Sequence, residues 1–358
     1  MEKTRHTVLI GSYTEPGAPG VRRVAVDSAT GEMRACAPAA PDAGNPIYFA
    51  LAPGGRRLYV AQASAPDADR ATAGALAAYT LDAGGAATRI DLLPLPYSVP
   101  CHISLTPGGG HLLYAEYSGA HAGAVALRAD GTFGDRSEVH HEGSGPNLKR
   151  QASAHCHCAV AAPDGAGVFV CDLGTDTVNA YAVAAAPSAA LEPSPERDFH
   201  APPGSGPRHL VFNGAGDRAY LIYELGNAVQ AFSYAGGRLT PLQAPLSTLP
   251  AGFGGETKCA AIRLSPDGKW LLASNRGHDS IAAFRILADG TLDGSPAISA
   301  LDGRFPRDFI FLAGDCVMAG HKLSDTVGLY RFDAATGALR RIGVPYAMPR
   351  PLAFAALK

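Results

Sequence analysis

The chain has 358 residues, a formal net charge of −2 and 47% hydrophobic residues. Single hydrophobic cores usually stop growing at about 250–300 residues, so this length predicts either two domains or a modular architecture. The near-neutral charge, without a basic block, argues against nucleic acid as a partner. The sequence lacks a long apolar segment, so we expect neither a signal peptide nor a membrane partner. Seven cysteines without a paired spacing are typical of reduced thiols, and we therefore expect a cytoplasmic protein.

The predicted strands recur in a fixed order along the chain. An anchor residue precedes an alternating apolar run, a Gly-rich reversal and a second apolar run; in segment 206–227, Leu210 and Phe212 alternate and the second run ends at Tyr223. A third apolar run and a weaker fourth one follow each hairpin. The anchors recur at intervals of about 43–55 residues. They are Pro46, Pro100, His155, Pro207, Cys259, Pro306 and Pro349.

This period predicts a β-propeller. Repeats of about 40–50 residues with short strands and Gly/Pro turns are typical of blades with four strands each. After Pro349 the chain ends before a second strand, and residues 7–14 (TVLIGSYT) resemble the second strands of the other repeats. We therefore predict an all-β fold with a single domain over residues 1–358, a seven-bladed propeller of four-stranded antiparallel blades. Its last blade is closed by the N- and C-terminal strands.

The ionisable residues of the repeat concentrate at two positions. In a propeller the first strand of each blade lines the central channel, so residues just before it and just after the second strand share one face. We predict two polar rings around one mouth of this channel, which suits a binding pocket. Following the anchors by one position are Arg208, Arg307 and Arg350, and by two positions Tyr48, His102, His157, His209, Ala261, Asp308 and Pro351. The residues predicted to end the second strands are Gln62, Glu116, Asp172, Glu224, Asn275 with Arg276, and Lys322.

Two interpretations of these residues are open. His and Asp in propeller turns often serve only as hydrogen-bonding clips. The residues to which we assign that role are Asp172, Asp176 and Asp279. For the cluster as a whole a ligand site is favoured, because Arg208, Arg276 and Arg307 at one small mouth would repel one another without an anionic ligand.

The run His155-Cys156-His157-Cys158 has the residue types of a zinc site. On a strand, however, the histidines point to one face and the cysteines to the other, so a four-ligand site would need residues from elsewhere. We therefore expect neither a metal nor another cofactor. The sequence also lacks a Gly-x-Ser-x-Gly nucleophile motif and a Gly-rich phosphate loop before a helix. Any hydrolysis is expected to use water directly.

Several longer motifs extend from Leu9 to the last repeat. They are RQASAHCH (150–157), PDGAGVFVCDLGTD (163–176), GSGPRHLVF (204–212), YELGNAV (223–229), SPDGKWLLASNRGHDSI (265–281) and FPRDF (305–309). With these motifs the chain resembles the lactonase family of seven-bladed propellers, which includes bacterial 6-phosphogluconolactonases and fungal carboxy-muconate lactonising enzymes. One departure is Ala261, where family members often carry an acid; this difference would alter the preferred lactone.

The resemblance implies hydrolysis of a sugar δ-lactone, above all of 6-phosphogluconolactone to 6-phosphogluconate, with a small anionic lactone as the partner and a monomer or weak homo-oligomer as the assembly. The reaction needs a base for water and donors for the oxyanion and the ring oxygen. We expect His157 to be the base, with Glu224 as the alternative base or as a residue that orients Arg208. Arg208 and Arg276 would bind the oxyanion and the anionic substituent, and Arg307 a phosphate. The remaining candidates for substrate binding are His209, His278, His155 and Asn275.

Two rival functions remain. In a cycloisomerase the same arginines would bind the carboxylates of a muconate while His157 or Glu224 moves a proton. In a non-enzymatic scaffold the propeller would bind protein partners. A scaffold predicts an exposed patch on the outer surface, whereas the ionisable residues singled out here are predicted to lie at the axis.

Overall fold

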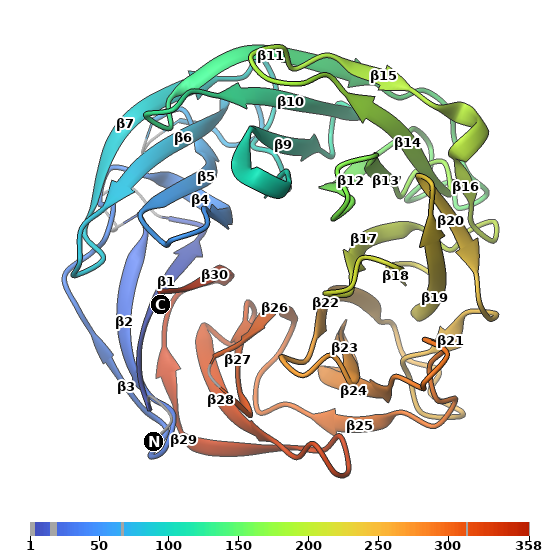
Figure 1. Ribbon diagram of the computed structural model, residues 1–358. Helices are drawn as coiled ribbons and strands as arrows, with labels where there is room; N and C mark the ends of the chain where they lie inside the picture. The colour runs from blue at the N-terminus through green and yellow to red at the C-terminus, as the bar shows by residue number, and fades with distance from the viewer. Residues whose placement is uncertain (1–3, 15–19, 66–67, 313, 358) are drawn as a thin grey trace.

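The computed structural model describes residues 4–14, 20–65, 68–312 and 314–357. Seven antiparallel sheets are arranged radially around a central axis, and each sheet is one blade (Figure 1). The innermost strands, which lie nearest this axis, are β30 (Pro351–Leu357), β4 (Gly44–Leu51), β8 (His102–Leu105), β12 (Cys156–Ala161), β17 (Pro207–Phe212), β22 (Lys258–Leu264) and β26 (Pro306–Phe311). The predicted all-β, seven-bladed fold is confirmed.

Three further strands complete each blade toward the outside. The second strands are β1 (Arg5–Ser12), β5 (Arg57–Ala63), β9 (His111–Glu116), β13 (Val168–Asp172), β18 (Arg218–Tyr223), β23 (Trp270–Arg276) and β27 (Cys316–His321). The third strands are β2 (Arg22–Asp27), β6 (Gly74–Leu81), β10 (His121–Leu127), β14 (Thr177–Val183), β19 (Ala228–Ala235), β24 (Ser280–Arg285) and β28 (Thr326–Phe332). The outermost are β3 (Glu32–Ala35), β7 (Ala87–Pro94), β11 (Phe133–His140), β15 (Leu191–Pro193), β20 (Arg238–Pro241), β25 (Ala297–Ala300) and β29 (Leu339–Ala347).

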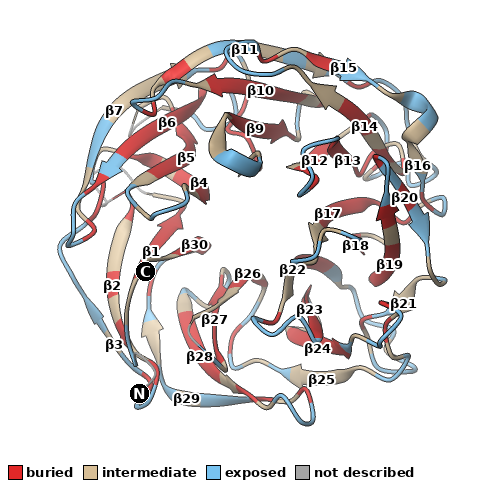
Figure 2. Ribbon diagram, viewed as in Figure 1, coloured by how far each residue is buried: buried red, intermediate tan, exposed pale blue. Residues whose placement is uncertain are grey.

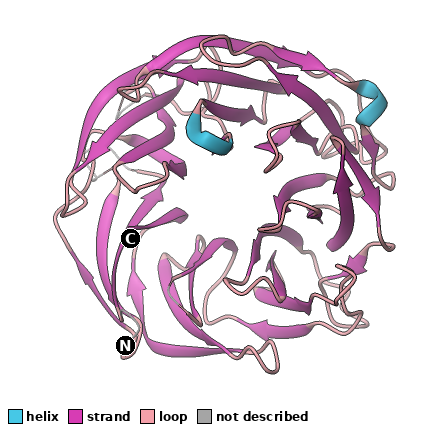
Figure 3. Cartoon of the chain, viewed as in Figure 1, coloured by secondary structure: helices cyan, strands magenta, loops and turns pink. Residues whose placement is uncertain are grey.

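Helical structure in the described part of the chain is confined to two single turns, η1 (Pro107–Gly109) and η2 (Pro195–Arg197) (Figure 3). Two short strands, β16 (Phe199–His200) and β21 (Leu246–Ser247), add to the edges of their blades by pairing with β14 and β19. Among the described helices, none is long and apolar enough to cross a bilayer. The fold is therefore carried almost entirely by sheet pairing and by packing between blades.

The chain closes into a ring through its two ends. The innermost strand of the first blade is the C-terminal β30, and it pairs with β1, for example Val8 with Ala356 and Ile10 with Phe354. The order in this blade is β3-β2-β1-β30. The prediction that the N- and C-terminal strands share one blade is confirmed.

The core lies between neighbouring blades. Side chains of β12–β14 and β17–β19 interdigitate in one such layer, where Phe169, Tyr223 and Phe232 are fully buried. Burial is strongest on the inner three strands of each blade, whereas among strand residues most of the exposed ones lie on the outermost strands (Figure 2). This distribution follows from the ring, because only the outermost strand of each sheet faces solvent along its whole length.

Candidate active site

A cavity of about 370 Å³ lies at one end of the propeller axis, where the innermost strands begin. Its wall is built from residues at the start of the innermost strands, residues just after the second strands, and neighbouring loops. The charged side chains among its described lining residues are Arg70, Arg150, Arg276, Arg307 and Glu224. Four cations and one carboxylate make this cavity suited to an anionic ligand.

β-Bulges direct three functional side chains toward this cavity. On β12, β17 and β26 the pairing register shifts after the first residue, and the unpaired residues in the bulges are His157, Arg208 and Arg307. A bulge leaves one extra residue outside the ladder and redirects its side chain. His157 and Arg307 line the cavity, and Arg208 lies beneath it in contact with Glu224. The pairing also shows that Cys156, rather than the predicted anchor His155, is equivalent to Pro207 and Pro306.

The predicted ring at the ends of the second strands mixes two structurally distinct positions. Pairing with the third strand makes Glu116, Asp172, Tyr223, Asn275 and His321 equivalent to one another. The next position is occupied by Tyr117, Leu173, Glu224, Arg276 and Lys322. Of this second set, Tyr117, Glu224 and Arg276 line the cavity. The ring predicted at the ends of the second strands is therefore corrected to two sets of equivalent positions. Only the second set contributes residues to the cavity wall.

Glu224 is the centre of a buried ionic cluster with Arg150, Arg208 and Arg276, called here the Glu224 cluster. Its Oε2 accepts from Arg208 Nε at 2.8 Å and lies 2.6 Å from Arg276 Nη2, and its Oε1 accepts from Arg150 Nη2 at 2.7 Å. Glu224 is 3% exposed and Arg208 2%. One carboxylate thus fixes the positions of three guanidinium groups. Charge-assisted interactions of this kind are short and geometrically specific.

The charges of the Glu224 cluster decide the ionisation of its members. Burial opposes the ionised form of Glu224, but Arg276 and Arg208 outweigh it and hold the pKa of the carboxyl well below its usual range. Burial, together with the charge of Arg276, lowers the pKa of Arg208 to about 10, although Glu224 acts in the opposite direction. At neutral pH Glu224 is therefore an anion and Arg208 a cation.

His157 lies at the wall of the cavity within reach of this cluster. Its Nε2 is 3.8 Å from Glu224 Oε2, and its Nδ1 is 3.8 Å from Cys101 Sγ. Burial and the charge of Arg208 hold the pKa of His157 well below the usual value, so the imidazole is neutral. Burial also raises the pKa of Cys101 to about 12, so this thiol is not a thiolate nucleophile at neutral pH.

Two more histidines, His209 and His102, lie close to Arg208 and His157. His209 Nε2 accepts from Arg208 Nη1 at 3.2 Å, and the His209 ring centroid lies 5.3 Å from that of His157 and 5.1 Å from that of His102. Burial and the Arg208 charge hold the pKa of His209 well below its ordinary value. His209 therefore supports Arg208 from the channel side and is not among the residues that line the cavity.

The predicted structural clips are confirmed. Asp172 Oδ1 accepts from the backbone N–H groups of His155, Gly174 and Thr175. Asp176 accepts from the N–H groups of Gly204 and Gly206, and Asp279 from those of Gly277 and Phe305. Glu116 does the same for Ser118 and Gly119. These carboxylates hold turns together and are not part of the cavity wall.

Besides His209, three more of the predicted substrate-binding residues lie outside the described cavity wall. Asn275 is fully buried and bonds to Thr248 and Ser280. His278 contacts Ser280 Oγ at 2.7 Å and packs edge-on against Phe253. His155 stacks on Tyr117 with a centroid separation of 4.2 Å. Of these three, only His155 supports a residue that lines the cavity.

Several lining residues were not predicted as part of the site, among them Tyr13, Arg70, Cys101, Tyr117 and Arg150. The sequence contains a signal for Arg150, because this residue begins the motif RQASAHCH. Tyr117 lies one position beyond Glu116, the residue predicted to end the second strand. Arg70 lies in the connection between β5 and β6, and no periodic pattern marks it.

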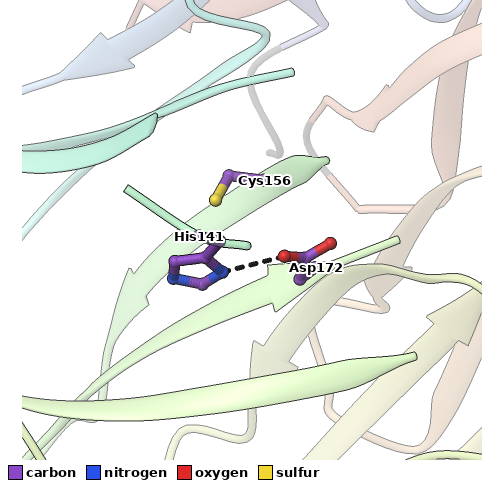
Figure 4. A group of neighbouring side chains, drawn as sticks. All are labelled: His141, Cys156 and Asp172. Atoms are coloured by element: carbon purple, nitrogen blue, oxygen red, sulfur yellow. Dashed lines mark hydrogen bonds and ion pairs between the residues drawn. The ribbon is translucent and has the colours of Figure 1, made fainter. Parts of the chain in front are cut away.

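One group of potential metal ligands stands out in the described residues, formed by His141, Cys156 and Asp172 (Figure 4). His141 Nδ1 bonds to Asp172 Oδ2 at 2.9 Å and its Nε2 meets Tyr181 Oη at 2.8 Å, so both ring nitrogens are engaged. Burial, reinforced by the Asp172 charge, raises the pKa of Cys156 well above its normal value. The donor set fits a structural hydrogen-bond network better than a zinc site. The run from His155 to Cys158 does not converge on one point, because His155 stacks on Tyr117 whereas Cys158 contacts His102.

Comparison with known proteins assigns the chain to a family. Residues 7–356 match the family described as lactonase, 7-bladed beta-propeller. The chain belongs to the lactonase family of seven-bladed β-propellers. It is 34% identical over 338 residues to an uncharacterised protein of Lactococcus lactis subsp. cremoris, and the match covers 94% of each chain.

Two family relatives carry informative names. A 6-phosphogluconolactonase of Bacillus subtilis is 30% identical over 357 residues, which cover 98% of this chain and 97% of the relative. A periplasmic gluconolactonase of Pseudomonas aeruginosa has a solved structure that superposes with a TM-score of 0.88 at 29% identity, covering 99% of each chain. The family is therefore established over almost the whole of this lactonase-family chain.

Proposed function

We propose that this protein hydrolyses the δ-lactone of a sugar acid, with 6-phosphogluconolactone as the first candidate substrate. The observation that carries the proposal is the cavity in which a neutral His157 lies beside the Glu224 cluster. Family membership and the names of the Bacillus and Pseudomonas relatives support it. Such a site provides a base for water and cations for the negative charge that develops on the carbonyl oxygen.

In this proposal His157 is the general base. Its imidazole is neutral at neutral pH and can take a proton from a water that attacks the lactone carbonyl. Glu224 is a weaker candidate, because its three arginine partners occupy the carboxylate and stabilise its charged form. Glu224 instead faces the imidazolium that forms during the reaction, at 3.8 Å, and stabilises it. The imidazolium then returns the proton to the ring oxygen as the lactone opens.

Of the three arginines in the Glu224 cluster, two line the cavity and Arg208 does not. Arg276 and Arg150 line the cavity and can donate to the carbonyl oxygen as it becomes an oxyanion. Arg208 uses Nε for Glu224 and Nη1 for His209 and for the carbonyl of Ala260, so its role is to hold Glu224 in place. This assignment moves the carbonyl contact from Arg208, where the sequence placed it, to Arg276 and Arg150.

A substrate panel tests the proposal. The purified protein should accelerate opening of 6-phosphogluconolactone, gluconolactone or both above the spontaneous rate in buffer that contains a strong chelator, because the proposed chemistry uses only the residues of the chain. The rate is followed as acid release. Muconates belong in the same panel, since a cycloisomerase would use the same groups. Turnover of muconates with no effect on any aldonolactone would replace the proposal with the cycloisomerase alternative.

The pH dependence tests the choice of base. Because burial and Arg208 lower the pKa of His157, its neutral, basic form persists as the pH falls through about 6.5, the ordinary value for imidazole. We therefore expect kcat/KM to stay level across that pH and to fall only at more acidic pH. The measurement is a pH profile of kcat/KM corrected for spontaneous opening. A half-loss of kcat/KM near pH 6.5 would mean that the base is an unperturbed histidine.

A further inference from the structure

A second group of residues, three cations gathered around a tyrosine ring, lies at the cavity apart from the Glu224 cluster. It consists of Tyr13, Arg70, Arg307 and Lys322, called here the Tyr13 cluster. Arg70 Cζ lies 4.3 Å from the centroid of the Tyr13 ring, and Lys322 Nζ lies 5.1 Å from it. Tyr13, Arg70 and Arg307 line the cavity, and Lys322 reaches the group through its contact with the Tyr13 ring.

The cations of the Tyr13 cluster have no acidic partner in the described part of the chain. Glu224 is the one carboxylate among the described lining residues, and its ion pairs are with Arg150, Arg208 and Arg276. Arg70, Arg307 and Lys322 form no ion pair with any described residue. Like charges gathered without an acid destabilise one another, and the pKa values in the cluster reflect this repulsion.

The pKa values of Tyr13 and Lys322 respond to the excess of positive charge. Burial raises the pKa of Tyr13, but the charges of Arg307, Arg70 and Lys322 outweigh it and lower that pKa. Burial lowers the pKa of Lys322, and the charges of Arg307 and Arg70 act in the same direction. Contacts with aromatic rings offset part of the repulsion, since Lys322 also lies 5.4 Å from the ring of Phe305. An anionic ligand would remove the rest.

We propose that the Tyr13 cluster is a subsite for the phosphoryl group of a phosphorylated lactone. The proposal rests on the proposed function of the same cavity and adds where the remote end of the substrate binds. Guanidinium groups match phosphate oxygens with paired N–H donors, an ammonium adds a point charge, and the Tyr13 hydroxyl adds a further donor. Three cations favour a dianion over the single charge of a carboxylate. The Glu224 cluster remains free to act on the lactone carbonyl.

The subsite should act on binding rather than on chemistry. A group that holds a remote phosphate contributes equally to the ground state and the transition state, so its loss raises KM and leaves kcat unchanged. Arg70 is the best residue to test, because it lines the cavity and, among the described residues, forms no ion pair with Glu224, whose partners are Arg150, Arg208 and Arg276. Tyr13→Phe removes only a hydroxyl and provides a second variant that preserves the ring.

The experiment compares wild-type protein with Arg70→Gln, Tyr13→Phe and the control Arg340→Gln, an exposed arginine on the outer strand β29. The constants kcat and KM are measured with 6-phosphogluconolactone and with gluconolactone, and inorganic phosphate is tested as a competitor. We expect Arg70→Gln to raise KM for the phosphorylated lactone by about tenfold or more, with kcat and the gluconolactone constants unchanged. Tyr13→Phe should act in the same direction, and Arg340→Gln should change neither substrate.

Two results would overturn the subsite. In the first, Arg70→Gln shifts both lactones equally; in the second, inorganic phosphate does not compete with the phosphorylated lactone. Calorimetric titration of wild-type protein with 6-phosphogluconate and with gluconate separates this proposal from the proposed function. If no lactone is hydrolysed but 6-phosphogluconate binds and Arg70→Gln abolishes that binding, the function fails and the subsite stands. If lactones are hydrolysed but the two acids bind alike, the function stands and the subsite fails.

Discussion

Replacing Glu224 with glutamine should reduce turnover by about a hundredfold or more, because it removes the charge that positions three arginines and stabilises the imidazolium of His157. The same change leaves Arg208 and Arg276 buried beside a neutral amide. Breaking a buried ion pair in this way costs about 3–5 kcal/mol of unfolding free energy. Turnover is measured at a temperature well below the melting transition, and stability by denaturant unfolding.

The matched control is Glu116→Gln, the same substitution in a clip. Glu116 is fully buried and accepts from the backbone of Ser118 and Gly119. Its loss should lower stability but leave turnover close to that of the wild type. If Glu224→Gln were as active as Glu116→Gln, the Glu224 cluster would be only a structural feature and the proposed site would be wrong.

Deleting residues 1–14 should have the largest effect on stability. The deletion removes β1, the partner of β30, and with it Val8, Leu9 and Ile10, which are completely buried. Each such apolar side chain contributes about 1.5–3 kcal/mol on burial. The loss also leaves β30 and β2 with unpaired edges, which promote aggregation. We expect the truncated protein to be insoluble or to unfold at a much lower denaturant concentration.

A circular permutant separates ring closure from simple loss of chain. In it, residues 1–40 follow Lys358, and the new N-terminus lies between β3 and β4. Because Thr7 pairs with Leu357, joining the old ends turns β30 and β1 into a hairpin without changing their partners. The permutant should unfold close to the wild type. A permutant as unstable as the deletion, or a deletion as stable as the wild type, would contradict closure through the terminal strands.

The sequence by itself determined the architecture, because a blade is a local unit. Alternating apolar residues and Gly-rich turns recur with each hairpin, and their period requires seven blades. The incomplete repeat after Pro349 and the unmatched strand at residues 7–14 required closure through the ends, as β1 and β30 show. The same repeat identified His157, Arg208, Glu224 and Arg276 as candidates. Ionisable side chains are conspicuous there because neighbouring positions of the repeat hold apolar or small residues.

Only the tertiary structure decided which polar residues meet. A shift of one position separates the clip Glu116 from the cavity residue Tyr117, and a sequence alignment without pairing cannot detect it. The bulges that direct His157, Arg208 and Arg307 toward the mouth depend on strand register, which is set across strands and not along one. Loop residues such as Arg70 and Arg150 follow no period at all. They reach the cavity because the ring brings distant loops to one axis, and this convergence exists only once all seven blades are in place.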